Sequence, residues 1–332
     1  MIKSKILRRI LKTFLVIFLL FCILMVTPRI WSAMNPSKPP VGYIFELLDY
    51  LALGVGLEKL VNTTPAIPAD IEEIKNIEYK NINGKSLQLD IYKPKNINSA
   101  APLLVFIHGG GWKGGNRADY LVYLIAYAKR GYVTATVSYR LLKDSPYPAC
   151  IEDITDAVKW FFGNGDTYGY DPDRIALIGG SAGGHLAMLA AYGWGNSDNN
   201  ADSIRSTGAG HKIKAVVDIY GPYDLTTEYA RNHPLVTSFI AHSYEEAPEL
   251  YKEASPKQYI DKNDPPTLIF QGTSDNLVPV SQSDNLKAHL DSLGVPCVYY
   301  RLPFWPHAMD VVHRVNEYCQ LKMEDFFNQY LK

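Results

Sequence analysis

The chain has 332 residues, of which 47% are hydrophobic and 20% are charged, so it is long and apolar enough to bury a large core rather than remain disordered. Its 33 basic and 34 acidic residues nearly cancel, and this balance gives no reason to expect a nucleic-acid partner. The four cysteines form no C-x-x-C pair and no Cys/His cluster typical of a zinc site; a full disulfide framework is not expected, although a single bridge stays open.

Residues 1–35 are predicted to form a basic tail and a transmembrane helix. The first twelve residues hold five basic residues and no acid, which leaves the remainder with a net charge of about −6. Residues 14–26 are all apolar, and the run from residue 10 to residue 26 would measure roughly 26 Å as a helix, near the lower limit for crossing a bilayer. The basic cluster before this run predicts a single-pass protein of the cell membrane with a cytoplasmic N-terminus and the catalytic domain outside.

A cleaved signal peptide has the same basic start and apolar middle, and it is the alternative to the anchor. The small-residue cleavage site that such a peptide needs is poor here, because residues 31–33 read Trp-Ser-Ala. We therefore expect an uncleaved anchor, whereas cleavage would give a secreted protein.

Residues 36–76 are predicted to form a linker that contains an amphipathic helix. Residues 41–61 are largely apolar but carry Glu46, Asp49, Glu58 and Lys59, which argues against a second membrane span. The apolar face of this helix would fit either a membrane surface or the catalytic domain, and we expect it to cover the domain.

From residue 77 to the end, predicted strands alternate with predicted helices, which is typical of an α/β domain. The strands open with a hairpin around Asn83-Gly84 and continue as short, uniformly apolar runs, as strands buried on both faces do. The expected strands are 78–80, 86–92, 103–107, 133–137, 175–178, 215–219, 268–270 and 298–302. The expected helices are 120–130, 150–162, 182–192, 281–293 and 309–330. This order predicts a mostly parallel central sheet flanked by helices.

Residues 221–267 are too long for a simple connection between two strands, so we expect them to form a small cap. Tyr220 and Tyr223 at its start, together with Trp112 in an earlier loop, are candidate substrate-binding residues. Ordinary packing accounts for each of them equally well.

Residues 179–183 read Gly-Gly-Ser-Ala-Gly and fit the G-x-S-x-G motif of a nucleophilic serine. A predicted strand precedes Ser181 and a predicted helix follows it, so the turn would project the serine hydroxyl at the carboxyl edge of the sheet. The amino end of that helix would also direct backbone N–H groups toward developing negative charge. The motif alone is a weak signal, because a glycine-rich strand-to-helix turn gives the same letters.

Residues 108–112 read His-Gly-Gly-Gly-Trp directly after the strand 103–107. Three glycines allow the backbone to curl so that its N–H groups face an oxyanion. A phosphate-binding loop of the Walker type would need G-K-S/T, which does not follow. The two glycine motifs in this order are far more specific than either alone.

Asp275 and His307 are the expected partners of Ser181, because both directly follow predicted strands and occur in the order Ser, Asp, His. Asp224 and Asp310 are rivals for the acid. Asp275 is preferred, because Asp310 is too close in sequence to His307 and Asp224 lies at the start of the cap.

These motifs resemble the hormone-sensitive-lipase-like and bacterial carboxylesterase branch of the α/β-hydrolases: HGGGW at 108–112, GGSAGGHLA at 179–187, GTSDNLVP at 272–279 and PHAM at 306–309. The resemblance covers about three quarters of the chain. It implies Ser181 as nucleophile, His307 as base and Asp275 as the residue that orients it. It also implies oxyanion donors from Gly109, Gly110 and Ala182.

The expected reaction is hydrolysis of short-chain, acetyl or feruloyl-type carboxylic esters through an acyl-enzyme, and such chemistry needs no metal or organic cofactor. The same three residues also serve acyl-peptide hydrolases, arylformamidases and polysaccharide deacetylases. A noncatalytic adhesion or binding protein is the alternative of another class, but such proteins usually lose the serine or the histidine. The expected partners are an ester substrate, free or linked to a polymer, and a membrane; the oligomeric state stays open.

Overall fold

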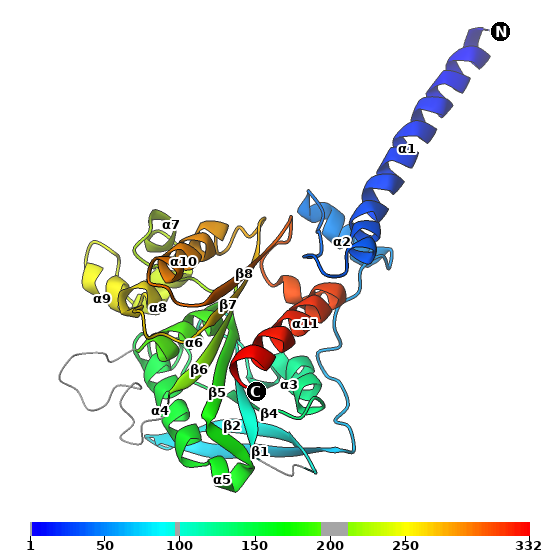
Figure 1. Ribbon diagram of the computed structural model, residues 1–332. Coiled ribbons are helices and arrows are strands. Elements are labelled where there is room, and N and C mark those ends of the chain that lie inside the picture. The colour runs from blue at the N-terminus through cyan, green and yellow to red at the C-terminus, as the bar shows by residue number, and fades with distance from the viewer. Residues whose placement is uncertain (1, 97–99, 194–211) are drawn as a thin grey trace.

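The structure, a computed structural model, describes residues 2–96, 100–193 and 212–332. These residues form one eight-stranded sheet in the order β1-β2-β4-β3-β5-β6-β7-β8 (Figure 1). The strands are β1 Ile71–Ile82, β2 Lys85–Pro94, β3 Ala101–Ile107, β4 Val133–Val137, β5 Tyr170–Gly180, β6 Ile213–Ile219, β7 Thr267–Gly272 and β8 Cys297–Leu302. Strand β2 pairs antiparallel with both β1 and β4, and all other neighbours are parallel.

The helices are α1 Ile2–Met34, α2 Glu46–Gly54, α3 Leu121–Ala128, α4 Ala149–Gly163, α5 Gly165–Tyr168, α6 Ala182–Tyr192, α7 Glu228–Arg231, α8 Pro234–Ile240, α9 Pro248–Glu253, α10 Val280–Ser292 and α11 His313–Tyr330. Short 3-10 turns cover Arg117–Tyr120 (η1), Pro256–Tyr259 (η2) and Met309–Val311 (η3).

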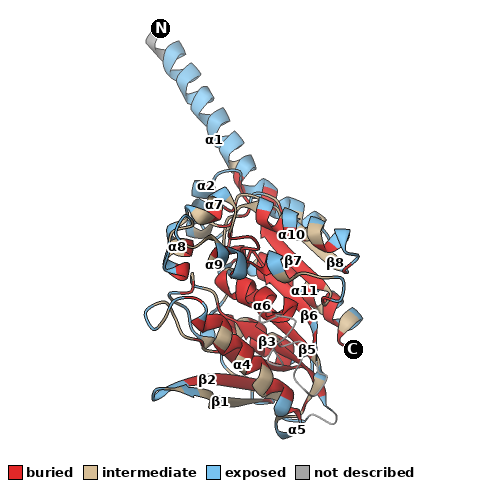
Figure 2. Ribbon diagram, turned by 90° about the vertical axis from the view of Figure 1, so that its left-hand side faces the viewer, coloured by how far each residue is buried: buried red, intermediate tan, exposed pale blue. Residues whose placement is uncertain are grey.

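The sheet has a hydrophobic cluster on each face, because successive side chains of a strand point to opposite sides. In β3, Val105 packs in the cluster that includes residues of α4, α6 and α10, whereas Phe106 packs in the cluster of α3 and α11. Both side chains are buried, as is most of every central strand (Figure 2). The predicted α/β fold, with a mostly parallel sheet flanked by helices, is therefore confirmed.

Some element bounds differ from those expected. Strand β1 begins at Ile71, six residues before the boundary drawn at residue 77. The amphipathic helix expected within residues 41–61 is only α2, nine residues long, and it ends at Gly54. The helix expected at 309–330 is split into η3 and α11. The expected cap, residues 221–267, contains α7, α8, α9 and η2.

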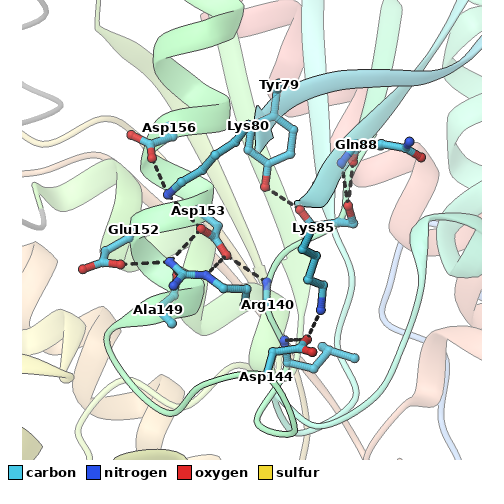
Figure 3. Close-up of polar contacts among 12 residues, drawn as sticks. Tyr79, Lys80, Lys85, Gln88, Arg140, Asp144, Ala149, Glu152, Asp153 and Asp156 are labelled. Carbon is cyan, nitrogen blue, oxygen red and sulfur yellow. Dashed lines mark hydrogen bonds and ion pairs between the residues drawn. The ribbon is translucent and has the colours of Figure 1, made fainter. Parts of the chain in front are cut away.

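The β1–β2 hairpin is attached to the domain by a network of charges around Asp153 of α4 (Figure 3). The Asp153 carboxylate is fully buried and accepts from the backbone and the guanidinium of Arg140, which follows β4. Lys80 of β1 donates to the same carboxylate at 2.9 Å. Three separate elements thus meet at one buried carboxylate. The network explains why the sequence holds a charge inside an otherwise apolar helix face.

Helix α1 projects from the domain, and its residues are almost all exposed from Lys5 onward (Figure 2). Its length and composition suit a membrane crossing, a property that a signal sequence near the start of a chain shares. The carboxyl end of α1 is joined to the domain by polar contacts. Arg314 of α11 donates to Ser32 and to the buried Glu58, which also pairs with Arg29. The Tyr43 hydroxyl donates to the Met25 carbonyl at 2.8 Å.

Candidate active site

Ser181 lies at a sharp turn between β5 and α6, as the G-x-S-x-G motif predicts. Its backbone has φ 56° and ψ −125°, a conformation that residues other than glycine rarely adopt. The turn requires glycine at two neighbours, because a Cβ on Gly179 would lie 2.3 Å from the Gly183 backbone and one on Gly183 would lie 2.0 Å from the Ile107 carbonyl. The strain and the close packing together hold the serine hydroxyl at the carboxyl edge of the sheet.

Ser181, His307 and Asp275 form a continuous chain of hydrogen bonds. The His307 Nε2 lies 2.9 Å from the Ser181 Oγ, and the His307 Nδ1 lies 2.7 Å from the Asp275 Oδ2. Because Nδ1 faces a carboxylate, it carries the proton, and Nε2 is left to accept from the serine hydroxyl. The imidazole is thus held in the tautomer that can remove the serine proton.

The Asp275 side chain is fully buried and held by several donors. Its Oδ1 accepts from the backbone N–H groups of Leu277 and Val278, at 2.9 and 2.8 Å. The amide of Gln271, at the end of β7, donates to Oδ2 at 3.1 Å. Sequence reasoning did not single out Gln271, whose only signal is its place one residue before the end of the strand that precedes Asp275.

The two rival aspartates have other partners. Asp224 pairs with Lys257 at 2.8 Å in the cap. Asp310 is buried and accepts hydrogen bonds from the hydroxyls of Tyr220 and Tyr123. Burial raises the pKa of Asp310, and the tyrosine hydrogen bonds oppose that shift. Neither rival contacts the Nδ1 of His307.

The glycine loop after β3 lies directly against Ser181. A Cβ on Gly109 would meet the Gly180 carbonyl at 2.7 Å and the Ser181 Cβ at 3.5 Å. Gly110 has φ 101°, which a side chain would not tolerate. His108 anchors the loop: its ring stacks on Tyr139 at 4.3 Å, and the Tyr139 hydroxyl donates to the His108 carbonyl. Gly109 thus lies against Ser181, Gly110 lines the same cavity, and Ala182, the first residue of α6, directly follows the serine.

Trp112 is buried and fastens this loop to the cap rather than standing free in the site. Its ring stacks on Phe239 of α8 at 4.2 Å, and its Nε1 donates to the Nδ1 of His185. Burial lowers the pKa of His185 to about 4, so this imidazole is neutral. Its Nε2 must then donate to the Ala254 carbonyl, 2.7 Å away in the cap.

Ser181 separates two hollows of very different size. A cavity of about 520 Å³ is lined by Gly109, Gly110, Ser181, Tyr220 and His307, together with Asp310 and neighbouring residues. A pocket of about 40 Å³ lies on the cap side of the serine, with Ala182, Trp112, Tyr229 and Val236 among its walls.

The candidate substrate-binding residues divide between these hollows. Tyr220 lines the large cavity, where its ring lies 4.6 Å from that of His307. Trp112 lines the small pocket. Tyr223 lines neither, and its hydroxyl bonds to His289 of α10 at 2.7 Å. Tyr120 and Tyr123, which sequence reasoning missed, complete the wall of the large cavity because η1 and α3 pass close to the serine.

The described residues contain no group of three His, Cys, Asp or Glu side chains placed to hold a metal ion. All four cysteines are free thiols, so the single bridge that the sequence left open is not formed.

The central sheet, the strained serine and the order of the loops define an α/β-hydrolase, of the hormone-sensitive-lipase-like branch that the motifs predicted. The chain belongs to the BD-FAE family, whose sequence pattern matches residues 89–290.

Relatives and solved structures agree with this assignment. The chain is 32% identical over 238 residues to the probable carboxylic ester hydrolase LipM of Mycobacterium tuberculosis, an alignment that covers 69% of this chain and 54% of LipM. A truncated carbohydrate esterase from gut microbiota is 27% identical, with a TM-score of 0.67 over 80% of this chain and 98% of that one. The butyrate-bound esterase Est2 of Thermogutta terrifontis is 25% identical, with a TM-score of 0.66 over 80% and 95%. The chain spans about half the length of the curated relatives it matches.

Proposed function

We propose that this chain is a serine carboxylesterase in which Ser181 is the nucleophile, His307 the general base and Asp275 the residue that orients it. The observation that carries the proposal is the unbroken hydrogen-bond chain from Asp275 through His307 to Ser181, at 2.7 and 2.9 Å. The names of the relatives support the same chemistry, because they include a carboxylic ester hydrolase and several esterases.

The reaction follows from these contacts. The His307 Nε2 takes the proton as the Ser181 oxygen attacks the ester carbonyl, and N–H groups of Gly109, Gly110 and Ala182 stabilise the oxyanion. His307 then gives the proton to the departing alcohol oxygen, which leaves an acyl group on Ser181. A water molecule deprotonated by His307 attacks this acyl-enzyme and releases the acid.

The two hollows suggest which part of the ester lies where. The departing oxygen must receive its proton from His307, and His307 lines only the large cavity. The alcohol part therefore belongs in that cavity. The acyl part belongs in the small pocket, which at about 40 Å³ is less than a tenth of the size of the large cavity. This supports short acyl groups, acetyl before butyryl; a feruloyl acyl group would have to lie in the large cavity instead.

The test is a series of p-nitrophenyl esters from acetyl to decanoyl, together with methyl ferulate and a formanilide, with Ser181→Ala as the inactive control. We expect kcat/KM to fall steeply beyond butyryl and the formanilide to react slowly. A preference for long acyl chains would contradict the small acyl pocket, and a preference for the formanilide would favour an arylformamidase. Hydrolysis by the Ser181→Ala variant at the wild-type rate would overturn the proposal itself.

We also propose that residues 1–35 anchor the chain in the cell membrane, that residues 36–76 link the anchor to the domain, and that residues 77–332 with a cap at about 221–267 carry the catalysis outside the cytoplasm. The apolar helix α1 and the basic residues before its apolar run support this arrangement. Secretion after cleavage of α1 is the alternative.

A further inference from the structure

Exposed apolar side chains are concentrated next to the foot of α1. Among the described residues outside α1, eleven large hydrophobic side chains are exposed, and nine of them lie in two short segments. Seven belong to residues 44–60, around α2, and the other two are Phe304 and Val311, on either side of His307. These nine residues are called here the juxtamembrane patch. A soluble surface of this size rarely gathers so many large apolar groups in one place without a partner.

The two segments of the patch are adjacent in space. The Gly42 N–H donates to the Pro303 carbonyl at 2.8 Å, and the Val61 N–H donates to the Val311 carbonyl at 2.8 Å. Leu60 forms an isolated antiparallel bridge with Val312. The patch is therefore one continuous surface that joins α2 to the loop holding His307.

Helix α2 is apolar on both sides, and only one side is covered. Leu48 and Ala52 are buried against Met25 of α1. Leu47 and Val55 are each 68% exposed, and Phe45 is 65% exposed. The sequence predicts that the apolar face of this helix covers the catalytic domain, but Leu48 and Ala52 instead cluster with Met25 and Tyr43. The other side of α2 has no partner within the described part of the chain.

The position along α1 at which α2 packs indicates what covers the exposed side of α2. Met25 lies inside the uninterrupted apolar run 14–26, so α2 packs on the part of α1 that would lie in or just below the headgroup region. Trp31 and Tyr50 are both exposed at this level, and Lys38 lies over the Trp31 ring. Aromatic and basic residues of this kind are typical of a membrane–water interface.

We propose that the juxtamembrane patch lies in the surface of the same bilayer that α1 crosses, as a second membrane contact of the catalytic domain. The proposal rests on the bilayer crossing by α1 and not on the ester chemistry. Val311 of the patch also lines the large cavity, as do Val61 and Thr63 next to it, so the cavity reaches the edge of the patch. An ester on an amphiphile in the outer leaflet would meet Ser181 without leaving the membrane surface.

Depth-dependent fluorescence quenching in the full-length protein tests this contact. The background is Cys22→Ser with Cys297→Ser, since the other two thiols are buried. An environment-sensitive NBD probe is attached to one introduced cysteine at a time: Leu47→Cys, Val55→Cys, Leu15→Cys or Ser86→Cys. Each labelled protein is reconstituted in phosphatidylcholine vesicles. The vesicles contain lipids that carry a nitroxide quencher either near the headgroup or deep in the acyl chain. Leu15 reports on α1. Ser86 is an exposed residue of β2 and serves as the control. The β1–β2 hairpin lies at the end of the molecule opposite α1 in both views (Figures 1 and 2).

We expect probes at 47 and 55 to lose about half of their fluorescence to the shallow nitroxide and less to the deep one, because interfacial helices lie near the headgroup boundary. The probe at 15 should respond to the deep nitroxide, and the probe at 86 to neither. Quenching at 15 but not at 47 and 55 would overturn the patch contact while keeping the anchor. A blue-shifted but unquenched probe at 47 would mean that protein, such as a second copy of this chain, covers the patch instead. Absence of quenching at all positions would overturn the anchor and the patch together, and the ester assay would stand unaffected.

Discussion

A single contact distinguishes Asp275, the proposed orienting acid, from its two rivals. The Asp275 carboxylate accepts from the His307 Nδ1, and its other oxygen is saturated by two backbone N–H groups. Asp275→Asn should lower kcat by about 10⁴ without unfolding the protein, because an amide cannot both hold the required tautomer and stabilise the imidazolium. Stopped-flow or steady-state hydrolysis of an acetyl ester measures the effect, with thermal melting as the check on folding.

Asp224→Asn is the matched control, since its carboxylate pairs with Lys257 in the cap. We expect it to keep most of the turnover. Asp310→Asn should retain far more turnover than Asp275→Asn, because Asp310 contacts tyrosine hydroxyls rather than the histidine. If Asp275→Asn remained active while either of these variants collapsed, Asp275 would not be the orienting acid.

At this scale the sequence identifies residues that carry a motif and misses residues that only tertiary packing brings in. Ser181, Asp275 and His307 each lie within five residues of the end of a strand, so their meeting at one edge of the sheet can be predicted. Tyr120 and Tyr123 lie far earlier in the chain with no motif around them, and only the path of η1 and α3 brings them to the cavity. Tyr223 follows a strand as well, yet its side chain points to His289, because the backbone direction after Tyr220 cannot be read from residue types.

Among the elements, the β1–β2 hairpin depends on the buried carboxylate of Asp153 (Figure 3). Asp153→Asn leaves the guanidinium of Arg140 and the ammonium of Lys80 without a buried counter-charge, and should lower the free energy of unfolding by about 3 kcal/mol. Activity per folded molecule should change much less than stability, because neither Asp153 nor its partners line the hollows beside Ser181. Urea unfolding followed by circular dichroism measures the loss.

Asp156→Asn is the control, because Asp156 pairs with the same Lys80 but its side chain is 39% exposed. Its substitution should cost less than about 1 kcal/mol, as for other exposed pairs. Equal losses in the two variants would show that burial of the carboxylate is not what matters.

In the proposed reaction the small pocket takes the acyl group, and α8 of the cap forms part of its wall. Val236 of α8 is buried in the wall of the 40 Å³ pocket, so Val236→Ala should create room for a longer acyl chain. The ratio of kcat/KM for butyryl to that for acetyl esters should rise about tenfold, the usual value of one added methylene in a fitted apolar pocket. Val122→Ala is the matched control, because Val122 lines the large cavity. An unchanged ratio in Val236→Ala would place the acyl group elsewhere.

The strands that were predicted well are those whose two faces are both buried. Strands β3 to β7 are buried on both faces, and their apolar runs mark them clearly. Strand β1 is an edge strand, and Glu72, Glu73 and Lys75 at its start read as loop. Helix α2 ends early because Gly56 takes a positive φ of 75° just after it, although the apolar pattern continues.

For the whole molecule, the first question is whether α1 remains part of the mature protein as a membrane anchor or is cleaved off. We expect full-length protein to remain with membranes after high-salt and carbonate washes, because an apolar helix that crosses a bilayer is not extracted by ionic conditions. Protease added from outside should reach Lys332. Release by carbonate of a chain with an intact N-terminal mass would contradict the anchor, whereas release of a chain shortened by about thirty residues would mean that a signal peptidase had removed α1.

The contacts at the carboxyl end of α1 also determine how far from the membrane the catalytic domain can move. Arg314 ties α1 to α11, and the Trp305 indole, two residues before His307, donates to the Pro40 carbonyl just after α1. Among the described residues, therefore, no long flexible tether lies between the helix and the catalytic domain. A domain on a long flexible linker can reach substrate at many distances from the membrane. A domain fixed to its transmembrane helix keeps one distance from the membrane and one orientation. If α1 spans the bilayer, the search for substrate is then two-dimensional: the protein diffuses laterally, and turnover on a surface-bound ester should scale with its density in the membrane plane rather than with its bulk concentration.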